Sequence, residues 1–306
     1  MGVQGTGWPN LDFCFVRIEI LTVTVIICTR NRPECLRSCL EAVNRLKPPA
    51  DEVLVVDNTT GDADTDAIAR EFSARYAVEP VKGLSRARNR GLAESRCEIV
   101  AFIDDDAIPR TDWLGRLLTP FEDPQVAAVT GKILAPEAAD DGEPESPLIV
   151  NNKVVHWFEI ATFGGLGLGS NMALRRSACT GWTVFDVRLG RGGPIEIADE
   201  NFAFASLLSR GYTGVHLPTA VVTHPRQRHD TQAHRARNSF AYWLLLFSEF
   251  PARRRDLRQF LFRRLRRERL GWQRGTQDPG VIITSSWWAK LKSGASGLLL
   301  FLRTRK

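Results

Sequence analysis

The sequence predicts an α/β protein whose mostly parallel sheet has helices on both sides. Three runs, at residues 21–29, 51–58 and 98–103, are rich in β-branched and apolar residues and predict strands. Their apolar residues are consecutive, which is typical of strands that are buried on both faces. Helical segments alternate with these runs, and this alternation favours parallel strands joined by helices.

The helix after the first strand has both a start signal and an apolar face. We expect Asn31 to cap this helix and Pro33 to lie in its first turn. The apolar residues that follow fall on one helical face: Leu36, Leu40 and Val43. A second helix is expected to follow the second strand and to run through Phe72.

The rest of the first 225 residues is less regular. We expect a strand at 125–134, an exposed acidic loop at 136–147, a glycine-rich loop entering a helix at 190–212, and a last strand at 214–224. The glycines of residues 163–176 do not match G-x-G-x-x-G, and no strand that opens a βαβ unit precedes them. This pattern argues against a dinucleotide-binding loop at that place.

Charge is divided unevenly along the chain. Residues 226–306 contain 19 Lys/Arg and 5 Asp/Glu, a formal charge of +14, whereas residues 1–225 contain 22 and 30, a charge of −8. Residues 253–272 have one apolar stripe surrounded by arginines, and Trp287 and Trp288 follow. Basic helices with tryptophans and short apolar patches suit the surface of an anionic membrane. Because no segment has the ~18 apolar residues of a membrane span, we expect peripheral contact.

These observations divide the chain into three parts. We expect an N-terminal lead-in at residues 1–21, an α/β domain at 22–225 and a basic amphipathic helical region at 226–306. The six cysteines form no CxxC pair, so we expect them to be reduced and structural. That expectation, together with the absence of a secretory-signal pattern, favours the cytoplasm and the inner face of the plasma membrane.

Three neighbouring carboxylates at the end of a strand indicate a site rather than a solvated surface. Asp104, Asp105 and Asp106 directly follow the apolar run 98–103. Each like-charge pair costs about 3 kcal/mol at roughly 5 Å and an effective dielectric constant of about 20, and a bound cation would offset that cost. Ligands of open α/β sheets bind beyond the carboxyl ends of the strands, where Asp57 also lies. Capping of the next helix is the structural alternative.

Seven short motifs occur in one order across residues 22–225. They are VTVIICTRNRP, DEVLVVDN, GLSRARNRGL, FIDDDAIP, GSNMALRR, ADENFAF and VVTH. Each is weak alone, but in this order the chain resembles the inverting glycosyltransferases of family 2, which have the Rossmann-like GT-A fold. The resemblance does not extend to the basic C-terminal region. It implies transfer of a sugar from a nucleoside diphosphate to an acceptor hydroxyl.

The resemblance also implies a divalent cation, Mn²⁺ or Mg²⁺, that neutralises the leaving diphosphate. Asp104 and Asp106 match the D-x-D element of the family. Asp106 would bind the cation, and Asp104 would face the ribose or the water shell of the cation. His224 matches a histidine that often completes the metal site, although a lone histidine is more often structural. For Asp105, contact with the donor and a solvent or capping role both stay open.

By the same resemblance, the loops after the first two strands bind the nucleotide, with a UDP-sugar as the expected donor. Thr29 and Arg30 would contact the base and the ribose. Asp57 would accept a hydrogen bond from the uracil or the ribose, unless it only stabilises a turn. In the "ARN" element, Arg88 can face the diphosphate and Asn89 can organise the loop.

The catalytic base is expected at the start of the helix within residues 190–212. The family usually has Glu-Asp there, with the second acid as the base, but this chain has Asp199 followed by Glu200. Counting back from the RGY sequence places Glu200 in the base position and leaves Asp199 as a helix cap, and an exchange of roles stays open. Asn171 and Met172 are expected to contact the acceptor or the donor sugar, with core packing as the alternative for Met172.

The sequence therefore predicts a metal-dependent inverting glycosyltransferase that acts on a lipid-linked or cell-surface glycan. Three alternatives stay open: a protein that binds nucleic acid through its arginine-rich region, a nucleotidyltransferase on the same fold, and an inactive relative that only binds nucleotide sugar. Runs of arginine can bind the phosphates of a nucleic acid in a protein that has no enzymatic activity. However, no known nucleic-acid-binding module is visible, and leucines and tryptophans interleave the arginines. We therefore expect no nucleic acid as a partner.

Overall fold

The structure, a computed structural model, describes residues 21–137, 146–225, 231–269 and 287–304. Two stretches within these ranges, 264–269 and 287–293, are described as helical backbone only. Nearly all of the expected N-terminal lead-in and most of the expected acidic loop lie outside the described residues.

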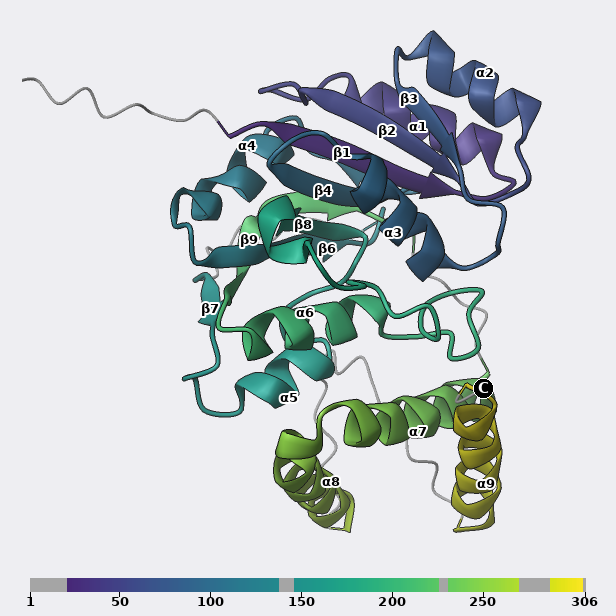
Figure 1. Ribbon diagram of the computed structural model, residues 1–306, viewed down its shortest axis with the longest axis vertical. Coiled ribbons are helices and arrows are strands. Elements are labelled where there is room, and N and C mark those ends of the chain that lie inside the picture. Colours follow the sequence, from purple (N-terminus) through teal and green to yellow (C-terminus); the bar gives the residue numbers. More distant parts are fainter. Residues whose placement is uncertain (1–20, 138–145, 226–230, 270–286, 305–306) are drawn as a thin grey trace, which may run out of the picture.

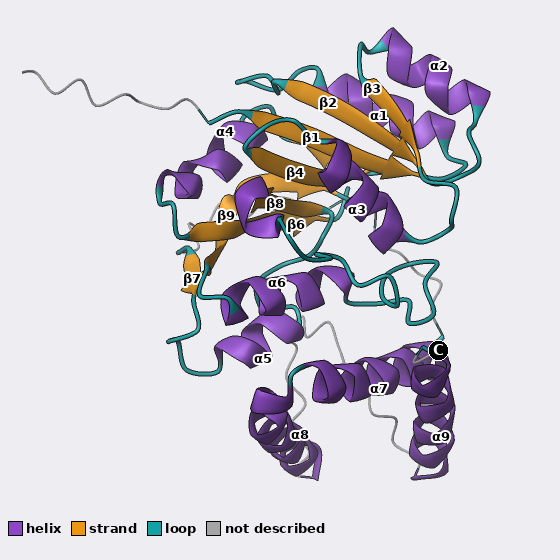
Figure 2. Ribbon diagram, viewed as in Figure 1, coloured by secondary structure: helices purple, strands orange, loops and turns teal. Residues whose placement is uncertain are grey.

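A mixed sheet forms the centre of the molecule (Figures 1 and 2). The strands of the described residues are β1 (Val23–Thr29), β2 (Glu52–Asp57), β3 (Arg75–Val78), β4 (Ile99–Asp104), β5 (Ile108–Pro109), β6 (Val126–Leu134), β7 (Leu148–Val150), β8 (Asn171–Arg175) and β9 (Thr213–Thr223). Their order is β3-β2-β1-β4-β8-β6-β9-β5, and β7 pairs with β9 beside this path.

The five predicted strands are all present, as β1, β2, β4, β6 and β9, so the predicted α/β class is confirmed. β1 to β4 are parallel to one another. β8 runs antiparallel between β4 and β6. It lies in the second half of residues 163–176, where we had predicted no strand. β3, β5 and β7 were also missed, because runs of two to four residues are too short to show a period.

Helices cover both faces of the sheet (Figure 2). They are α1 (Pro33–Val43), α2 (Ala63–Glu71), α3 (Leu84–Glu94), α4 (Trp113–Leu118), α5 (Trp157–Thr162), α6 (Asp199–Ser209), α7 (Gln232–Glu249), α8 (Arg254–Arg269) and α9 (Trp287–Arg303). In the part of the chain that the structure describes, three short 3₁₀ helices lie at Thr119–Glu122, Arg176–Cys179 and Pro251–Arg253.

Alternate residues of β1 face two separate hydrophobic cores. Val25 and Ile27 pack in the core that includes α1, α2 and α4. Ile26 packs in the other core, with α3 and the helices drawn below the sheet in Figure 1. Because all three side chains are fully buried, each contributes about 1.5–3 kcal/mol of transfer free energy, and the strand is fixed in its register.

The C-terminal helices share the second of these cores. Tyr242, Leu245 and Leu246 of α7, Leu257 of α8 and Phe301 of α9 are all buried within it. Residues before and after residue 225 therefore pack in one hydrophobic core. The division of the chain into domains at that residue stays a prediction. Among the described residues, no helix combines the length and apolar character needed to cross a membrane.

Candidate active site

The site lies where the carboxyl ends of neighbouring strands meet. Asp104 is the last residue of β4 and pairs in register with Cys28 of β1, and Thr29 of β1 pairs with Asp57 of β2. Because parallel strands end at one edge of the sheet, the residues that follow them converge. Asp105 and Asp106 continue from β4 into the turn after it.

Asp104, Asp106 and His224 form a candidate metal centre. Each offers a ligand atom, and these atoms all lie within 4.8 Å of one another. His224 Nε2 lies 3.0 Å from Asp106 Oδ1 and 3.4 Å from Asp104 Oδ2. The arrangement brings together three residues that the sequence predicted as ligands. Asp104 and Asp106 lie at the end of β4 and in the turn after it, and His224, which is 120 residues after Asp104, directly follows β9.

The donor set fits a divalent cation. Asp106 Oδ1 and His224 Nε2 are buried, face each other and have no partner in hydrogen-bond geometry among the described residues. Buried polar atoms are normally satisfied, so a pair left open in this way suits an ion between them. Two carboxylates and one imidazole are compatible with Mn²⁺, and Mg²⁺ would depend more on the carboxylates and on water.

The three groups also interact with one another electrostatically. Burial lowers the pKa of His224, but the carboxylates of Asp104 and Asp106 outweigh this effect and raise the pKa to about 10. Burial would raise the pKa of Asp106, yet His224 and Arg32 together hold it well below its usual range. Without a metal ion the histidine is therefore a cation between two carboxylates. A divalent ion would replace its proton, and binding would release that proton.

Asp105 has a different environment from its two neighbours. Its side chain is only 5% exposed, and both carboxylate oxygens have partners. Thr29 Oγ1 donates to Oδ2 at 2.7 Å, and Arg32 Nη1 donates to Oδ1 at 2.7 Å. Thr29 is also buried, so its hydroxyl is committed to Asp105 instead of facing the cleft. These contacts give the side chains of Asp105 and Thr29 a structural role. Asp105 also lines the cleft described below, so its contact with the donor stays a prediction.

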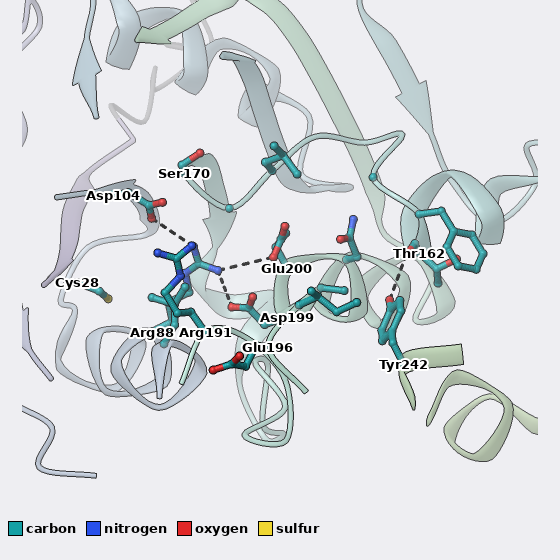
Figure 3. Close-up of a pocket in the computed structure, with 18 of the residues that line it drawn as sticks. Cys28, Arg88, Asp104, Thr162, Ser170, Arg191, Glu196, Asp199, Glu200 and Tyr242 are labelled. Carbon is teal, nitrogen blue, oxygen red and sulfur yellow. Dashed lines mark hydrogen bonds and ion pairs between the residues drawn. The ribbon is translucent and has the colours of Figure 1, made fainter. Parts of the chain in front are cut away.

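Arg88 links the metal-binding side of the site to the start of α6 (Figure 3). Its guanidinium lies 2.5 Å from Asp199 Oδ2, 3.5 Å from Asp104 Oδ1 and 3.9 Å from Glu200 Oε2, measured from the nearest nitrogen. The side chain is 3% exposed. Gly169 makes this position possible, because a Cβ there would lie 2.5 Å from a guanidinium nitrogen.

Glu200 differs from Asp199 in having no close cationic partner. Burial raises the pKa of Glu200 to about 8, and the charge of Asp199 adds to this shift while Arg88 opposes it. The expected role of Asp199 as helix cap is wrong. The N-cap of α6 is Ala198, in a left-handed conformation with φ 63°, and Asp199 is the first helical residue and pairs with Arg88.

The predicted nucleotide contacts lie at the ends of β1 and β2. Asp57 is fully buried, and its Oδ2 accepts hydrogen bonds from the Thr59 hydroxyl, the Asp62 amide and the Tyr76 hydroxyl. Its Oδ1 has no hydrogen bond among the described residues. Arg30 is exposed and donates to the Asn58 carbonyl.

Asn89 does not line the cleft. Its side chain exchanges two hydrogen bonds with the backbone of Phe185, which leaves it as an organiser of the loop. The placement of Asn171 contradicts the expected contact with substrate. It is fully buried, accepts from Trp113 Nε1 at 2.8 Å and donates to the carbonyls of Lys132 and Ala220. Met172 is also fully buried, as its core-packing alternative predicted.

A cleft of about 650 Å³ joins these groups. Arg88, Asp104, Asp199, Glu200 and His224 line it. Thr162 and Tyr242 lie on the opposite wall (Figure 3). Gly164 and Leu168 also line the cleft, and they belong to the glycine-rich loop 164–169, which we expected to approach the sugar and the acceptor. The sequence did not single out the other lining residues on this side: Thr162 at the end of α5, Phe163 directly after it, and Ser239 and Tyr242 of α7. No local motif marks Tyr242, because only the packing of α7 brings it here, with its hydroxyl donating to the Thr162 carbonyl at 3.2 Å.

Several known proteins that resemble this chain are glycosyltransferases. The model of a family described as glycosyl transferase family 2 matches residues 24–180, about half of the chain. The succinoglycan biosynthesis protein ExoM of Rhizobium meliloti is 32% identical over 225 residues, which cover 68% of this chain and 68% of ExoM. The glycosyltransferase AglE of Haloferax volcanii is 37% identical over 119 residues, 36% of this chain and only 39% of AglE.

The fold is shared with solved structures as well. The mannosyltransferase PcManGT from Pyrobaculum calidifontis, in complex with GDP-Man and Mn²⁺, superposes with a TM-score of 0.58 at 18% identity. The superposition covers 93% of this chain and 79% of that one. At this identity the similarity shows the fold alone, which is the GT-A type that the sequence predicted.

Proposed function

Because the chain belongs to glycosyltransferase family 2, we propose that it transfers a sugar from a nucleoside diphosphate to an acceptor hydroxyl by a metal-dependent, inverting reaction. One observation carries this proposal. Asp104 and His224 of the candidate metal centre and a carboxylate with a raised pKa, Glu200, line one cleft, and Arg88 lies between them. Inversion needs that separation, because the base must act on the side opposite the leaving group.

Asp104, Asp106 and His224 would hold the cation. When bound, a divalent ion stabilises the negative charge that develops on the leaving diphosphate. Mn²⁺ is the first candidate, because PcManGT was solved with Mn²⁺ and the donor set here includes an imidazole nitrogen. Arg88 would add a fixed positive charge beside Asp104, where the diphosphate is expected.

Glu200 is the proposed base. A general base is most effective when its pKa lies near the pH at which the enzyme works, and the pKa of Glu200 is about 8. Its carboxylate also has no cation at short distance, since Arg88 is 3.9 Å away. Asp199 is the weaker candidate, since its carboxylate is bound to Arg88 at 2.5 Å. We therefore assign Asp199 to holding Arg88 and Glu200 to accepting the proton of the acceptor.

The donor would bind over the ends of β1 and β2, with Arg30 and Asp57 beside the nucleotide. The unsatisfied Oδ1 of Asp57 supports this placement, because a buried acceptor without a partner gains most from a donor group on a ligand. We propose a UDP-sugar, and a GDP-sugar is the alternative that PcManGT suggests.

We propose a lipid-linked or polysaccharide acceptor, met at the cytoplasmic face of a membrane. The name of ExoM refers to polysaccharide biosynthesis. Phe163, Leu168 and Tyr242 give the far wall of the cleft apolar surface, which suits an acceptor with an apolar part. The C-terminal helices also expose Phe262 (70%), among the arginines of α8, and Leu299 (60%), in α9 before Arg303. Peripheral contact with anionic lipid requires such apolar and basic side chains together.

The test is a product assay with the full chain. UDP-, GDP- and dTDP-sugars are incubated with and without Mn²⁺, and the release of nucleoside diphosphate is measured. We expect release from one donor class, its loss in excess EDTA, and its loss in the variant Asp106→Asn. Full activity in EDTA or in that variant would contradict the metal role, and release of pyrophosphate would show a nucleotidyltransferase. Membership of the family does not favour the nucleic-acid-binding alternative.

A further inference from the structure

Arg32 joins two of the three neighbouring acids through a forked contact. Its Nη1 donates to Asp105 Oδ1 at 2.7 Å, and its Nη2 donates to Asp106 Oδ2 at 2.6 Å. The side chains of Asp105 and Asp106 are 5% and 9% exposed, whereas that of Arg32 is 39% exposed. Each of the two nitrogens therefore donates to a carboxylate that is nearly buried.

The Asp106 carboxylate is divided between two partners. Oδ2 accepts from Arg32, while Oδ1 faces His224 Nε2 at 3.0 Å without a hydrogen bond. A carboxylate can rotate about its terminal torsion, so a fixed partner on one oxygen decides where the other oxygen lies. Arg32 occupies only the oxygen that faces away from the candidate metal centre.

The position of Arg32 is itself fixed from both sides of the contact. Pro33 begins α1, so Arg32 is the N-cap, and the expectation that Asn31 would be the cap is wrong. Asn31 instead has a left-handed backbone with φ 54° directly before Arg32. On the other side, Thr29 Oγ1 donates to Asp105 Oδ2 at 2.7 Å and anchors that carboxylate. Thr29, Asp105, Arg32 and Asp106 form a continuous chain of contacts that ends at the candidate metal centre.

We propose that Arg32 is a positioning residue for the metal centre, holding Asp106 so that Oδ1 stays directed toward the cation and His224. The inference rests on the proposed metal site, and it assigns Asp105 the role of an anchor for Arg32. A guanidinium suits this role because its planar fork can hold two carboxylates at once. Partners of this kind, one step removed from the metal, commonly change metal affinity 10–100-fold.

A second explanation makes the opposite prediction. If Arg32 only balanced the charge of the acids, it would compete with a divalent ion. Its removal would then leave the acids more negative and would tighten binding of the ion. If Arg32 instead positions Asp106, its removal lets the carboxylate rotate, and binding of the ion weakens. The direction of the change in affinity separates the two.

The experiment measures the affinity of the full chain for Mn²⁺ by electron paramagnetic resonance, alone and with UDP or GDP. We expect Arg32→Gln to bind Mn²⁺ about tenfold or more weakly than the wild type. Arg32→Lys keeps the charge but cannot hold both carboxylates in the same geometry, so we expect weaker binding there too. Arg37→Gln is the matched control. Arg37 lies on the same helix, is 36% exposed and pairs with Glu71 at 2.6 Å, and we expect its variant to bind as the wild type does.

Thermal unfolding of each variant shows whether the fold is intact. If Arg32→Gln does not fold, the comparison of Arg32→Lys with the wild type decides the question. Unchanged or tighter binding of Mn²⁺ in a folded Arg32 variant would overturn the positioning role while leaving the metal site in place. Absence of Mn²⁺ binding by the wild type under all of these conditions would overturn the metal site itself, and the role of Arg32 with it.

Discussion

Arg88 and Asp199 form a buried ion pair, with 2.5 Å between Nη1 and Oδ2 and side-chain exposures of 3% and 4%. The pair joins α3 to the first turn of α6, across 111 residues of sequence. It also decides how the two acids at the start of α6 differ. The Asp199 carboxylate forms the short ion pair with Arg88. The Glu200 carboxylate is buried and has only a distant contact with Arg88, and its pKa is therefore raised.

Breaking this pair is expected to destabilise the fold. Arg88→Met leaves Asp199 buried without its cation, and removal of one partner of a buried pair costs about 3–5 kcal/mol. Urea unfolding measures the change in the free energy of unfolding. Arg90→Met is the matched control, because Arg90 lies on the same helix but pairs with Glu94 at the surface, with exposures of 45% and 31%. That variant is expected to lose less than about 1 kcal/mol, and equal losses in the two variants would contradict the argument.

Loss of the proposed base is expected to affect chemistry more than binding. Glu200→Gln removes the proton acceptor without changing the size of the side chain, and kcat should fall by about 10²- to 10⁴-fold. Affinity for Mn²⁺ and for the nucleotide should stay close to that of the wild type, because Glu200 is not one of the candidate metal ligands and its carboxylate lies 3.9 Å from Arg88. The control is Glu196→Gln, on the rim of the same cleft and 38% exposed. A Glu200→Gln variant with full kcat would exclude Glu200 as the base.

The pKa of Glu200 predicts the pH dependence of the reaction. A base must be unprotonated to act, and a carboxyl group with a pKa of about 8 is only about one-tenth ionised at pH 7. With Mn²⁺ saturating, kcat/KM should therefore rise with pH and level off above about pH 8.

Asp199 provides an internal check on that assignment. Its negative charge is one cause of the raised pKa of Glu200, and Asp199→Asn removes that charge. The rise in kcat/KM should then move to lower pH, because Arg88 loses a competing partner and is left to stabilise the Glu200 carboxylate. The Glu196→Gln variant should keep the wild-type profile. A profile that is the same in all three proteins would show that another group controls the rate.

Much of this site could be predicted because its residues follow strands. The runs before Asp57 and Asp104 are apolar and β-branched, so their ends could be located, and parallel strands place those ends at one edge of the sheet. The three candidate ligands Asp104, Asp106 and His224 were predicted in this way together with the family resemblance. The structure brings them within reach of a common ion.

The charge balance of the acids could not be predicted in the same way. The sequence suggested that a cation must supply the positive charge beside the three acids. The structure shows that Arg32 and Arg88 already supply two positive charges, at 2.6–3.5 Å from the carboxylates. Neither contact follows from a local period, because each joins residues that are 16 or more positions apart and depends on how α1 and α3 pack against the sheet. The cleft wall formed by α7 was missed for the same reason.

Gly169 offers a last test of the position of Arg88. A Cβ at this residue would lie 2.5–2.8 Å from three atoms of the guanidinium, too close for Arg88 to keep its place between Asp104 and Asp199. Gly169→Ala is therefore expected to lower kcat/KM by about tenfold or more, since small displacements of positioned groups can cost about 100-fold. The variant should also lower the free energy of unfolding, by about 1–3 kcal/mol, as overpacking does.

Gly294→Ala is the control for this substitution. Gly294 lies in α9, away from the cleft, and a Cβ there would meet no atom within 4 Å. Alanine is also the better helix former by about 1 kcal/mol, so this variant should keep wild-type activity and be equally or more stable. If Gly169→Ala behaved like Gly294→Ala in both assays, Arg88 would have room to move without loss. The link that we infer between its position and catalysis would then be wrong.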